Sequence, residues 1–297
     1  METAGFVVVD KPAGMTSHDV VSRLRRLART RRVGHAGTLD PMATGVLVLA
    51  VGRATRLLTY VTGCDKAYEA TVRLGRSTVT DDAEGEPTGG APADAVTDDA
   101  VRAALVPLTG EIRQVPSAVS AIKINGERAY KRVRAGDTVE LPARPVTVSR
   151  LDVHAMRREP DGLLDVDVTV ECSSGTYVRA IARDLGAALG VGGHLTALRR
   201  TRVGGFTLAE ARTLDELADL DDPVTLPMAA AAARILPGRE VDAAAARTVA
   251  HGGPLPPSGL TGPYAVYGPG DRLLAVVAER DGRARPEIVL TTPDELV

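Results

Sequence analysis

Aromatic residues, cysteine and lysine are scarce in this sequence. It has no tryptophan, two phenylalanines and six tyrosines among 297 residues, and its two cysteines are Cys64 and Cys172. Two cysteines exclude a disulfide framework and a cysteine-ligated zinc cluster, and the five histidines lack metal-ligand spacing, so we expect no metal site. The apolar stretch at residues 46–51 is too short to span a bilayer. With no charged-then-apolar leader pattern, the sequence predicts a cytoplasmic protein without a membrane partner.

The net charge of −2 hides a strong segregation of charge along the chain. Residues 1–75 carry 11 basic and 6 acidic side chains, residues 76–112 carry 2 and 8, and residues 113–150 carry 8 and 3. Only four of the 36 basic residues are lysine, and arginine is well suited to phosphate contacts. Two basic blocks around an acidic one are consistent with a surface that follows nucleic-acid phosphates, although charge alone favours a solvated surface.

A helix is predicted from Thr16 and Ser17, which are good N-cap residues, to about Thr30. Its apolar residues at 20, 21, 24, 27 and 28 fall on one face, so that face is expected to pack against the protein. The remaining positions and the exit of the helix are rich in arginine: Arg23, Arg25, Arg26, Arg29, Arg31 and Arg32.

Residues 33–45 are predicted to form a loop, because they contain three glycines and a proline. Asp40 precedes Pro41 and is therefore unlikely to lie inside a helix. One interpretation is an Asx-turn carboxylate that caps its own loop. The other is a nucleophile or general base that a rigid loop holds at the mouth of a sheet.

A carboxylate in that position needs a cation to remain ionised, and Arg179 is the best candidate. We expect it one turn inside a helix at residues 176–190, with Ser173, Ser174 and Thr176 capping the start. An exposed helix arginine is the alternative. Tyr68, in a strand predicted at residues 68–74, either packs in the core or stacks on an extruded base.

The rest of the chain reads as mixed α and β structure. Residues 80–97 are acidic and rich in glycine and proline, so we expect a mobile surface loop there. A break near residues 222–240 predicts a boundary before a small β-rich domain. Strands are predicted at residues 5–10, 46–51, 163–171, 263–267, 272–278 and 286–291, and a short helix at residues 98–106.

Several of these segments together resemble the bacterial tRNA pseudouridine-55 synthases, the TruB family. The resemblance lies in residues 9–17 (VDKPAGMTS), 34–47 (GHAGTLDPMATGVL), 66–68 (KAY), 174–179 (SGTYVR) and 195–200 (LTALRR), in the expected order. Residues 114–123 resemble the family's RNA-gripping insertion, with Ser117 where a second proline is common and Val119 where an aromatic residue is common.

The resemblance implies an α+β pseudouridine synthase fold, with a mixed, mainly antiparallel central sheet flanked by helices and loops. It implies a catalytic domain at residues 1–236, with the insertion at about 113–150, and a PUA-like RNA-binding domain at residues 237–297. The implied activity is isomerisation of uridine 55 in the T-arm loop of tRNA by base flipping, by a monomer that needs no cofactor. Attack of the catalytic aspartate at C6 of the base and attack at C1′ of the ribose both remain open.

The resemblance also implies roles for individual residues. Asp40 corresponds to the nucleophile, Tyr68 to the tyrosine that stacks on the uracil, and Arg179 to the arginine that pairs with the aspartate. His35 corresponds to the residue that occupies the space left by the flipped base. Lys11 would support the catalytic loop, and Tyr177 and Leu198 would line the substrate pocket. The residues expected to contact the RNA backbone are Arg23, Arg25, Arg26, Arg29, Lys123, Lys131 and Arg132.

Two other functions are compatible with parts of the sequence. One is a tRNA-binding protein that has lost catalysis, against which the presence of Asp40, Tyr68 and Arg179 argues. The other is a glycoside or nucleoside hydrolase that uses two carboxylates such as Asp10 and Asp40. A hydrolase would release free base, whereas an isomerase would not.

Overall fold

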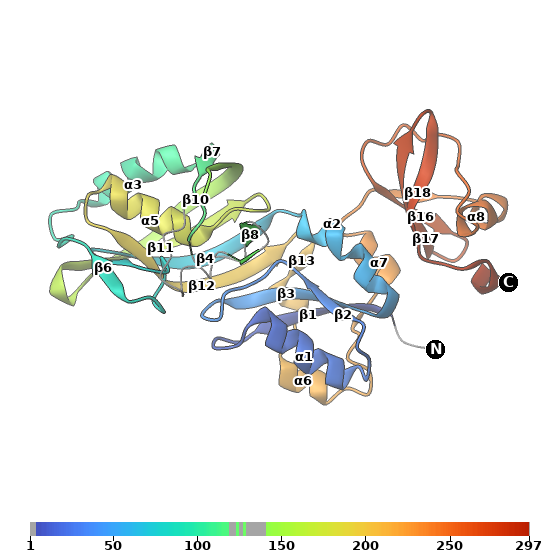
Figure 1. Ribbon diagram of the computed structural model, residues 1–297, viewed down its shortest axis with the longest axis horizontal. Coiled ribbons are helices and arrows are strands. Elements are labelled where there is room, and N and C mark those ends of the chain that lie inside the picture. The colour runs from blue at the N-terminus through green and yellow to red at the C-terminus, as the bar shows by residue number, and fades with distance from the viewer. Residues whose placement is uncertain (1–3, 119–122, 125–126, 129–140, 297) are drawn as a thin grey trace.

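A long curved sheet forms the body of the protein in the computed structural model, which describes residues 4–118, 123–124, 127–128 and 141–296 (Figure 1). This 10-stranded sheet has the order β14-β1-β3-β12-β4-β11-β10-β7, with β2 added at β3 and β13 at β12. β3 and β12 run parallel, and the other neighbours are antiparallel. The predicted α+β class and mainly antiparallel sheet are confirmed. The strands are β1 (Gly5–Lys11), β2 (Val33–Ala36), β3 (Thr44–Val51), β4 (Lys66–Leu74), β7 (Gly110–Gln114), β10 (Arg144–Glu159), β11 (Leu163–Cys172), β12 (Gly193–Val203), β13 (Phe206–Thr207) and β14 (Leu226–Pro227).

The two halves of the sheet meet where β3 lies against β12. Their parallel pairing is short, with Thr44 opposite Arg199 and Gly45 opposite Arg200. A Cβ atom on Gly45 would lie 2.2 Å from the carbonyl oxygen of Arg200, and its φ of +97° also favours glycine. This close approach brings the loop that precedes β3, and with it Asp40, to the junction of the two halves.

Helices cover the sheet in two separate cores. One core joins α1 (Ser17–Leu27) and α6 (Leu214–Ala218) to α5 (Val178–Ala188) and α3 (Asp98–Leu105) along one side of the sheet. The other core places η1 (Gly52–Leu57), α2 (Leu58–Thr62) and α7 (Met228–Ala232) against the opposite side of β1 and β3. The remaining short elements are β5 (Ser77–Thr78), β6 (Pro87–Gly89), β8 (Lys123–Ile124), β9 (Glu127–Arg128), η2 (Val106–Leu108), η3 (Pro160–Gly162) and η4 (Leu208–Glu210). No helix in the described part of the chain is long and apolar enough to cross a membrane.

A second, smaller sheet forms one end of the molecule, beyond α2 and α7 (Figure 1). It consists of β15 (Gly238–Glu240), β16 (Tyr264–Gly268), β17 (Arg272–Arg280) and β18 (Arg283–Val289), accompanied by α8 (Ala243–Ala250) and η5 (Pro293–Leu296). The β-rich character expected of the C-terminal part is confirmed. Its predicted limit at residues 236 and 237 stays a prediction.

Several predictions about local structure are wrong. Residues 33–36 form strand β2 instead of loop, because they pair along the free edge of β3. Residues 80–97 are not simply a mobile surface loop, since Asp81 and Asp82 are buried and the Asp81 carbonyl accepts a backbone hydrogen bond from Leu195. Strand β12 was not predicted, and β10 extends through the charged residues 150–159.

Candidate active site

The loop that carries Asp40 is fastened from two directions. The Ser17 hydroxyl, at the start of α1, accepts a hydrogen bond from the Leu39 amide at 2.8 Å and lies 3.2 Å from the Leu39 carbonyl. The buried Lys11 ammonium donates to the carbonyl oxygens of Met15 and Pro41, at 2.6 and 3.2 Å. Because these bonds hold the residues on both sides of Asp40, the position of its carboxylate is set by the scaffold.

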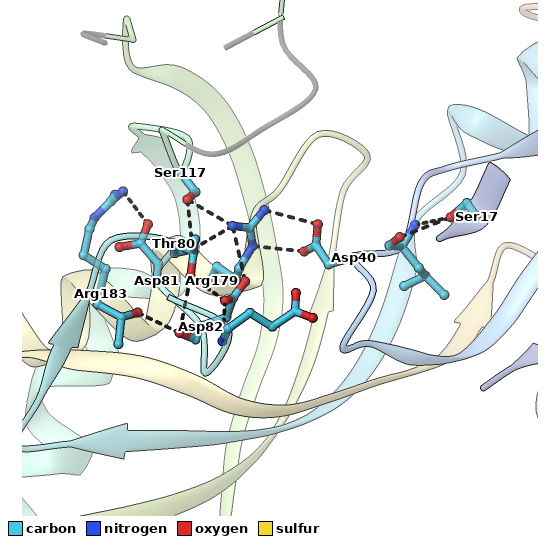
Figure 2. A network of polar contacts seen from close by, with 11 residues as sticks. Ser17, Asp40, Thr80, Asp81, Asp82, Ser117, Arg179 and Arg183 are labelled. Atoms are coloured by element: carbon cyan, nitrogen blue, oxygen red, sulfur yellow. Dashed lines mark hydrogen bonds and ion pairs between the residues drawn. The ribbon is translucent and has the colours of Figure 1, made fainter. Parts of the chain in front are cut away.

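Asp40 and Arg179 form a two-point ion pair (Figure 2). Nε of Arg179 lies 2.9 Å from Oδ2 of Asp40, and an Nη2 hydrogen is donated to Oδ1 at 3.2 Å. Arg179 is 5% exposed and the Asp40 side chain is 34% exposed, so the guanidinium is buried while the carboxylate remains accessible. The pairing expected for these two residues is therefore present in the structure.

A second group of residues holds the other edge of the Arg179 guanidinium. Nη1 donates to the Thr80 carbonyl at 2.7 Å and to the Ser117 hydroxyl at 3.2 Å, and it lies 3.5 Å from the buried carboxylate of Asp82. Figure 2 shows these groups on the side of Arg179 away from Asp40. Sequence reasoning missed Asp82, because its acidic surroundings had been interpreted as a solvated loop.

The start of α5 is fixed differently from our expectation. The hydroxyls of Ser173, Ser174 and Thr176 do not cap it; Ser174, for example, donates to the Thr62 carbonyl at 2.8 Å. The side chain of Gln114 instead binds the N-cap residue itself, accepting a hydrogen bond from the Tyr177 amide at 2.8 Å and donating to its carbonyl at 3.1 Å. This contact joins β7 to the first turn of the helix that presents Arg179.

Burial and neighbouring charge act on the Asp40 carboxyl in opposite directions. Removal from bulk water raises its pKa, the positive charge of Arg179 opposes that rise, and the negative charge of Asp82 adds to it. The net result is a pKa above the ordinary value for aspartate. Arg179 thus opposes the protonation of Asp40 that burial and the charge of Asp82 favour.

Asp40 lies on the wall of a cavity of about 350 Å³. Tyr68 from β4, Leu198 from β12 and Tyr177 at the start of α5 also line it. Tyr68 is 7% exposed, and burial raises the pKa of its hydroxyl. The lining is completed by residues 37–39, Thr62, Lys66, residues 174–176, Val178, Arg179 and Arg200. A carboxylate, an aromatic ring and aliphatic side chains around such a space suit a planar heterocycle next to a nucleophile.

Comparison with known proteins identifies the family. The profile described as "TruB family pseudouridylate synthase (N terminal domain)" matches residues 25–178. Two further profiles, "tRNA pseudouridylate synthase B C-terminal domain" and "tRNA Pseudouridine synthase II, C terminal", match residues 179–231 and 236–291. The chain belongs to the TruB family. Pseudouridylate synthases are isomerases, so the chain is a member of an isomerase family.

Relatives within the TruB family match over nearly their whole length. The "tRNA pseudouridine synthase B" of Arthrobacter sp. (strain FB24) is 58% identical over 302 residues, covering 98% of each chain. That of Thermobifida fusca (strain YX) is 59% identical over 288 residues, covering 96% of this chain and 98% of the relative.

Solved structures with the same fold include chains from complexes of several components. A chain in an H/ACA RNP bound to a substrate RNA containing 2′-deoxyuridine is 25% identical, with a TM-score of 0.74, over 99% of this chain and 88% of that chain. A chain in a Cbf5-Nop10-Gar1 complex is 27% identical, with a TM-score of 0.76, and the match covers 98% of this chain and 86% of that chain.

Two residues assigned to substrate binding from the TruB resemblance lie outside the cavity lining. Lys11 is buried beneath the Asp40 loop, and burial lowers its pKa to about 8, so its position fits support of the loop. His35 lies on β2 opposite Leu49 of β3, and burial lowers the pKa of its imidazole. The role that the resemblance implies for His35, occupying the space left by the flipped base, stays a prediction.

The predicted RNA-contacting arginines of α1 and of the residues just after it are not equivalent. Arg26 and Arg29 are exposed, whereas Arg23 lies 4.0 Å from Asp215 and Arg25 donates to the Val33 carbonyl at 3.3 Å. Lys131, Arg132 and Val119 lie outside the described residues, and for Lys123 the structure describes only the backbone, in β8. Among the arginines of α1, Arg26 is therefore the clearest candidate for phosphate contact.

Proposed function

We propose that this member of the TruB family isomerises uridine 55 in the T-arm loop of tRNA to pseudouridine, with Asp40 as the attacking group. The observation that supports this most directly is the Asp40–Arg179 ion pair on the wall of a cavity that Tyr68 and Leu198 also line. The bacterial relatives carry the name tRNA pseudouridine synthase B, which points to tRNA as the substrate. The PUA-like role of the C-terminal sheet in RNA binding belongs to the same proposal.

The reaction needs a base that has left its stack. Uridine in a folded loop is inaccessible to a carboxylate, so the enzyme must extrude the nucleotide and replace the lost stacking with its own contacts. Tyr68 supplies an aromatic face, and Leu198 and Tyr177 supply further apolar or aromatic surface in the cavity. In the same proposal, the protein acts as a monomer in the cytoplasm.

Asp40 attacks the extruded nucleotide while Arg179 fixes the orientation of the carboxylate. The N1–C1′ bond breaks, the uracil turns, and C5 bonds to C1′. C5 loses one proton and N1 gains one, so uridine and pseudouridine have the same atoms and the reaction consumes no cofactor. Tyr68, next to the base, is placed to help remove the C5 proton.

Incubation of the protein with an unmodified tRNA transcript tests this proposal. We expect pseudouridine at position 55 and no release of free uracil, and a transcript with cytidine at position 55 should remain unmodified. Release of free uracil would favour the hydrolase alternative. Pseudouridine at another position only, or no conversion, would overturn the proposed substrate.

A further inference from the structure

Two buried cations line the cavity on the side of the central sheet, and neither is used by the Asp40–Arg179 pair. They are Lys66 on β4 and Arg200 on β12, which are 7% and 1% exposed. A buried ammonium or guanidinium group loses hydration, and proteins ordinarily compensate it with a carboxylate. Their presence beside a substrate cavity therefore calls for an explanation.

The strand register places the two cations on one face. Arg200 is directly opposite Tyr68 in the pairing of β12 with β4, and Leu198 and Lys66 lie two residues from these along their strands. The two cations also converge on one point. A Cβ atom on Gly37 would lie 3.4 Å from Nη1 of Arg200 and 3.4 Å from Cε of Lys66.

Backbone carbonyls hold both cations in the described part of the chain, and the Tyr68 hydroxyl also bonds to Arg200, whereas no carboxylate pairs with either cation there. The Lys66 ammonium donates to the carbonyls of Thr62 and Cys64 at 3.1 and 2.7 Å. Arg200 donates from Nε to Val46 and from Nη2 to Gly37, at 2.7 and 3.0 Å. Burial and the nearby charge of Arg200 both lower the pKa of Lys66, and they outweigh the opposing effect of Asp65. The pair therefore gives this part of the cavity a net positive charge.

Arg179 does not add to this positive charge. Its guanidinium already binds Asp40, Asp82 and the Thr80 carbonyl, so its charge is largely neutralised by two carboxylates. The cavity thus separates its charges, with the nucleophile and its partner in one place and an uncompensated positive pair in another.

We propose that Lys66 and Arg200 bind the carbonyl oxygens of the extruded uracil and stabilise the negative charge that develops on them. This inference rests on the proposed function. When the N1–C1′ bond breaks, its electron pair stays on the uracil and is delocalised onto O2 and O4. Attack of Asp40 at C6 would likewise place negative charge on O4, so the assignment holds for both routes. Fixed donors directed at developing charge in a water-poor site are an effective form of catalysis.

The anionic uracil must also stay in the cavity while it turns. It then presents C5 to C1′, forms the new bond, loses the C5 proton and gains a proton at N1. A positive pair that can contact either oxygen holds the ring through this rotation without forming a covalent bond to it. The side chains of Lys66 and Arg200 are the cations placed for this task.

The test compares single-turnover rates of Lys66→Met and wild type on tRNA transcripts that contain uridine or 5-fluorouridine at position 55. The rate is read for both substrates as consumption of that nucleotide, because 5-fluorouridine has no C5 proton to lose and cannot form pseudouridine. Fluorine stabilises the uracil anion, so the fluorinated base depends less on help from the protein. For uridine we expect a loss of about 100-fold, the scale of removing one oxyanion donor. For 5-fluorouridine we expect a loss of about 10-fold or less on that scale, with transcript binding unchanged within about threefold.

Two variants control for folding and for general loss of charge. Lys66→Arg keeps a cation and should retain most of the rate. Arg202→Met lies on the same strand as Arg200, and its side chain pairs with Asp65 and Glu171 outside the cavity lining, so it should leave the ratio of the two rates unchanged. Since the ratio is measured on one protein sample, partial misfolding of Lys66→Met does not alter it.

Equal losses on the two substrates would overturn the inference. An equal loss together with weakened binding would show instead that the cations hold a phosphate group of the RNA. Failure of wild type to convert uridine would contradict the proposed function itself and is thereby distinguished from failure of this inference.

Discussion

At the scale of single residues, the site depends on one guanidinium shared between two carboxylates. Arg179 presents Nε and Nη2 to Asp40 and Nη1 to Asp82, Thr80 and Ser117. A planar guanidinium can bind both groups at once, whereas an ammonium is a single point of charge. The shape of arginine, as well as its charge, therefore orients the Asp40 carboxylate.

Replacing Arg179 with lysine should lower the single-turnover rate on tRNA by about 10- to 100-fold, because the two-point contact with Asp40 is lost. Arg183→Lys is the matched control. It lies one turn further along α5, where it contacts Asp81, Asp184 and the Val115 carbonyl, and it should change the rate less than threefold or so. Equal effects of the two substitutions would show that the fork on Asp40 is unimportant.

The pH dependence of the rate should report the charge on Asp40. Because its pKa is raised, the rate should fall on acidification with a midpoint above the ordinary aspartate value of about 3.9. Asp82 contributes to that rise, so Asp82→Asn should move the acidic midpoint to lower pH.

The control for this measurement is Asp81→Asn, since the buried Asp81 pairs with Arg183, whereas Asp82 lies beside Arg179 and raises the pKa of Asp40. We expect it to leave the acidic midpoint in place. An upward movement in Asp82→Asn, or identical profiles for both variants, would contradict the charge distribution described for the site.

At the scale of elements, the start of α1 helps to hold the loop that carries Asp40. The Ser17 hydroxyl is buried and satisfies the amide of Leu39, the residue before Asp40. Ser17→Ala should therefore leave a buried amide without its partner and reduce the free energy of unfolding by about 1–3 kcal/mol.

The same substitution should also lower the single-turnover rate, by roughly 10-fold, because the Asp40 loop becomes less ordered. Ser22→Ala, at an exposed position of the same helix, is the control for both measurements. A destabilised variant with an unchanged rate would show that this hydrogen bond supports the fold but not the position of Asp40.

Elements with regular patterns could be predicted from sequence, and irregular ones could not. The alternating residues of β4 and the capped amphipathic helix α1 were predicted within a few residues. In β12 the register shifts between Leu195 and Ala197 and between Arg200 and Arg202, which breaks the alternation that identifies a strand. Sequence pattern alone therefore does not place Leu198 and Arg200 on a strand beside the cavity, and only the family resemblance pointed to Leu198.

In the candidate site, too, residues in distinctive motifs could be predicted from the sequence and others could not. Asp40, Arg179 and Tyr68 stand in distinctive motifs, and the structure brings all three to one cavity. Asp82 could not be found, because only the folded chain shows that an acidic segment turns inward beneath Arg179. Its burial depends on contacts with residues far away in the sequence, which a local pattern does not record.

At the scale of the whole molecule, the C-terminal sheet is packed against the catalytic part. Apolar residues of β16 and β17 share a core with β1, β3 and α2. Polar contacts surround this core: Arg53 binds both carboxylate oxygens of Glu295 at 2.7 and 2.8 Å, and Tyr60 donates to Glu287 at 3.0 Å. These contacts give the smaller sheet a fixed position relative to the site.

The arginine face of α1 should contribute to RNA affinity in a salt-dependent way. Replacing Arg26 and Arg29 together with alanine should weaken tRNA binding and lower the slope of log K against log salt by about one per lost phosphate contact. Arg102→Ala, an exposed arginine on α3, is the comparison. An unchanged slope in the double variant would show that this face of α1 does not meet RNA.

The most direct test of the account is the single-turnover rate of Asp40→Asn on an unmodified tRNA transcript, measured beside Asp10→Asn. Asp10 is the other carboxylate considered for catalysis, and it is paired with Arg199 at 2.7 Å. We expect Asp40→Asn to bind tRNA but to form pseudouridine at least about 1,000-fold more slowly, whereas Asp10→Asn keeps most of the rate. Pseudouridine formation by Asp40→Asn at a rate near that of wild type would contradict the assignment of Asp40 as the nucleophile.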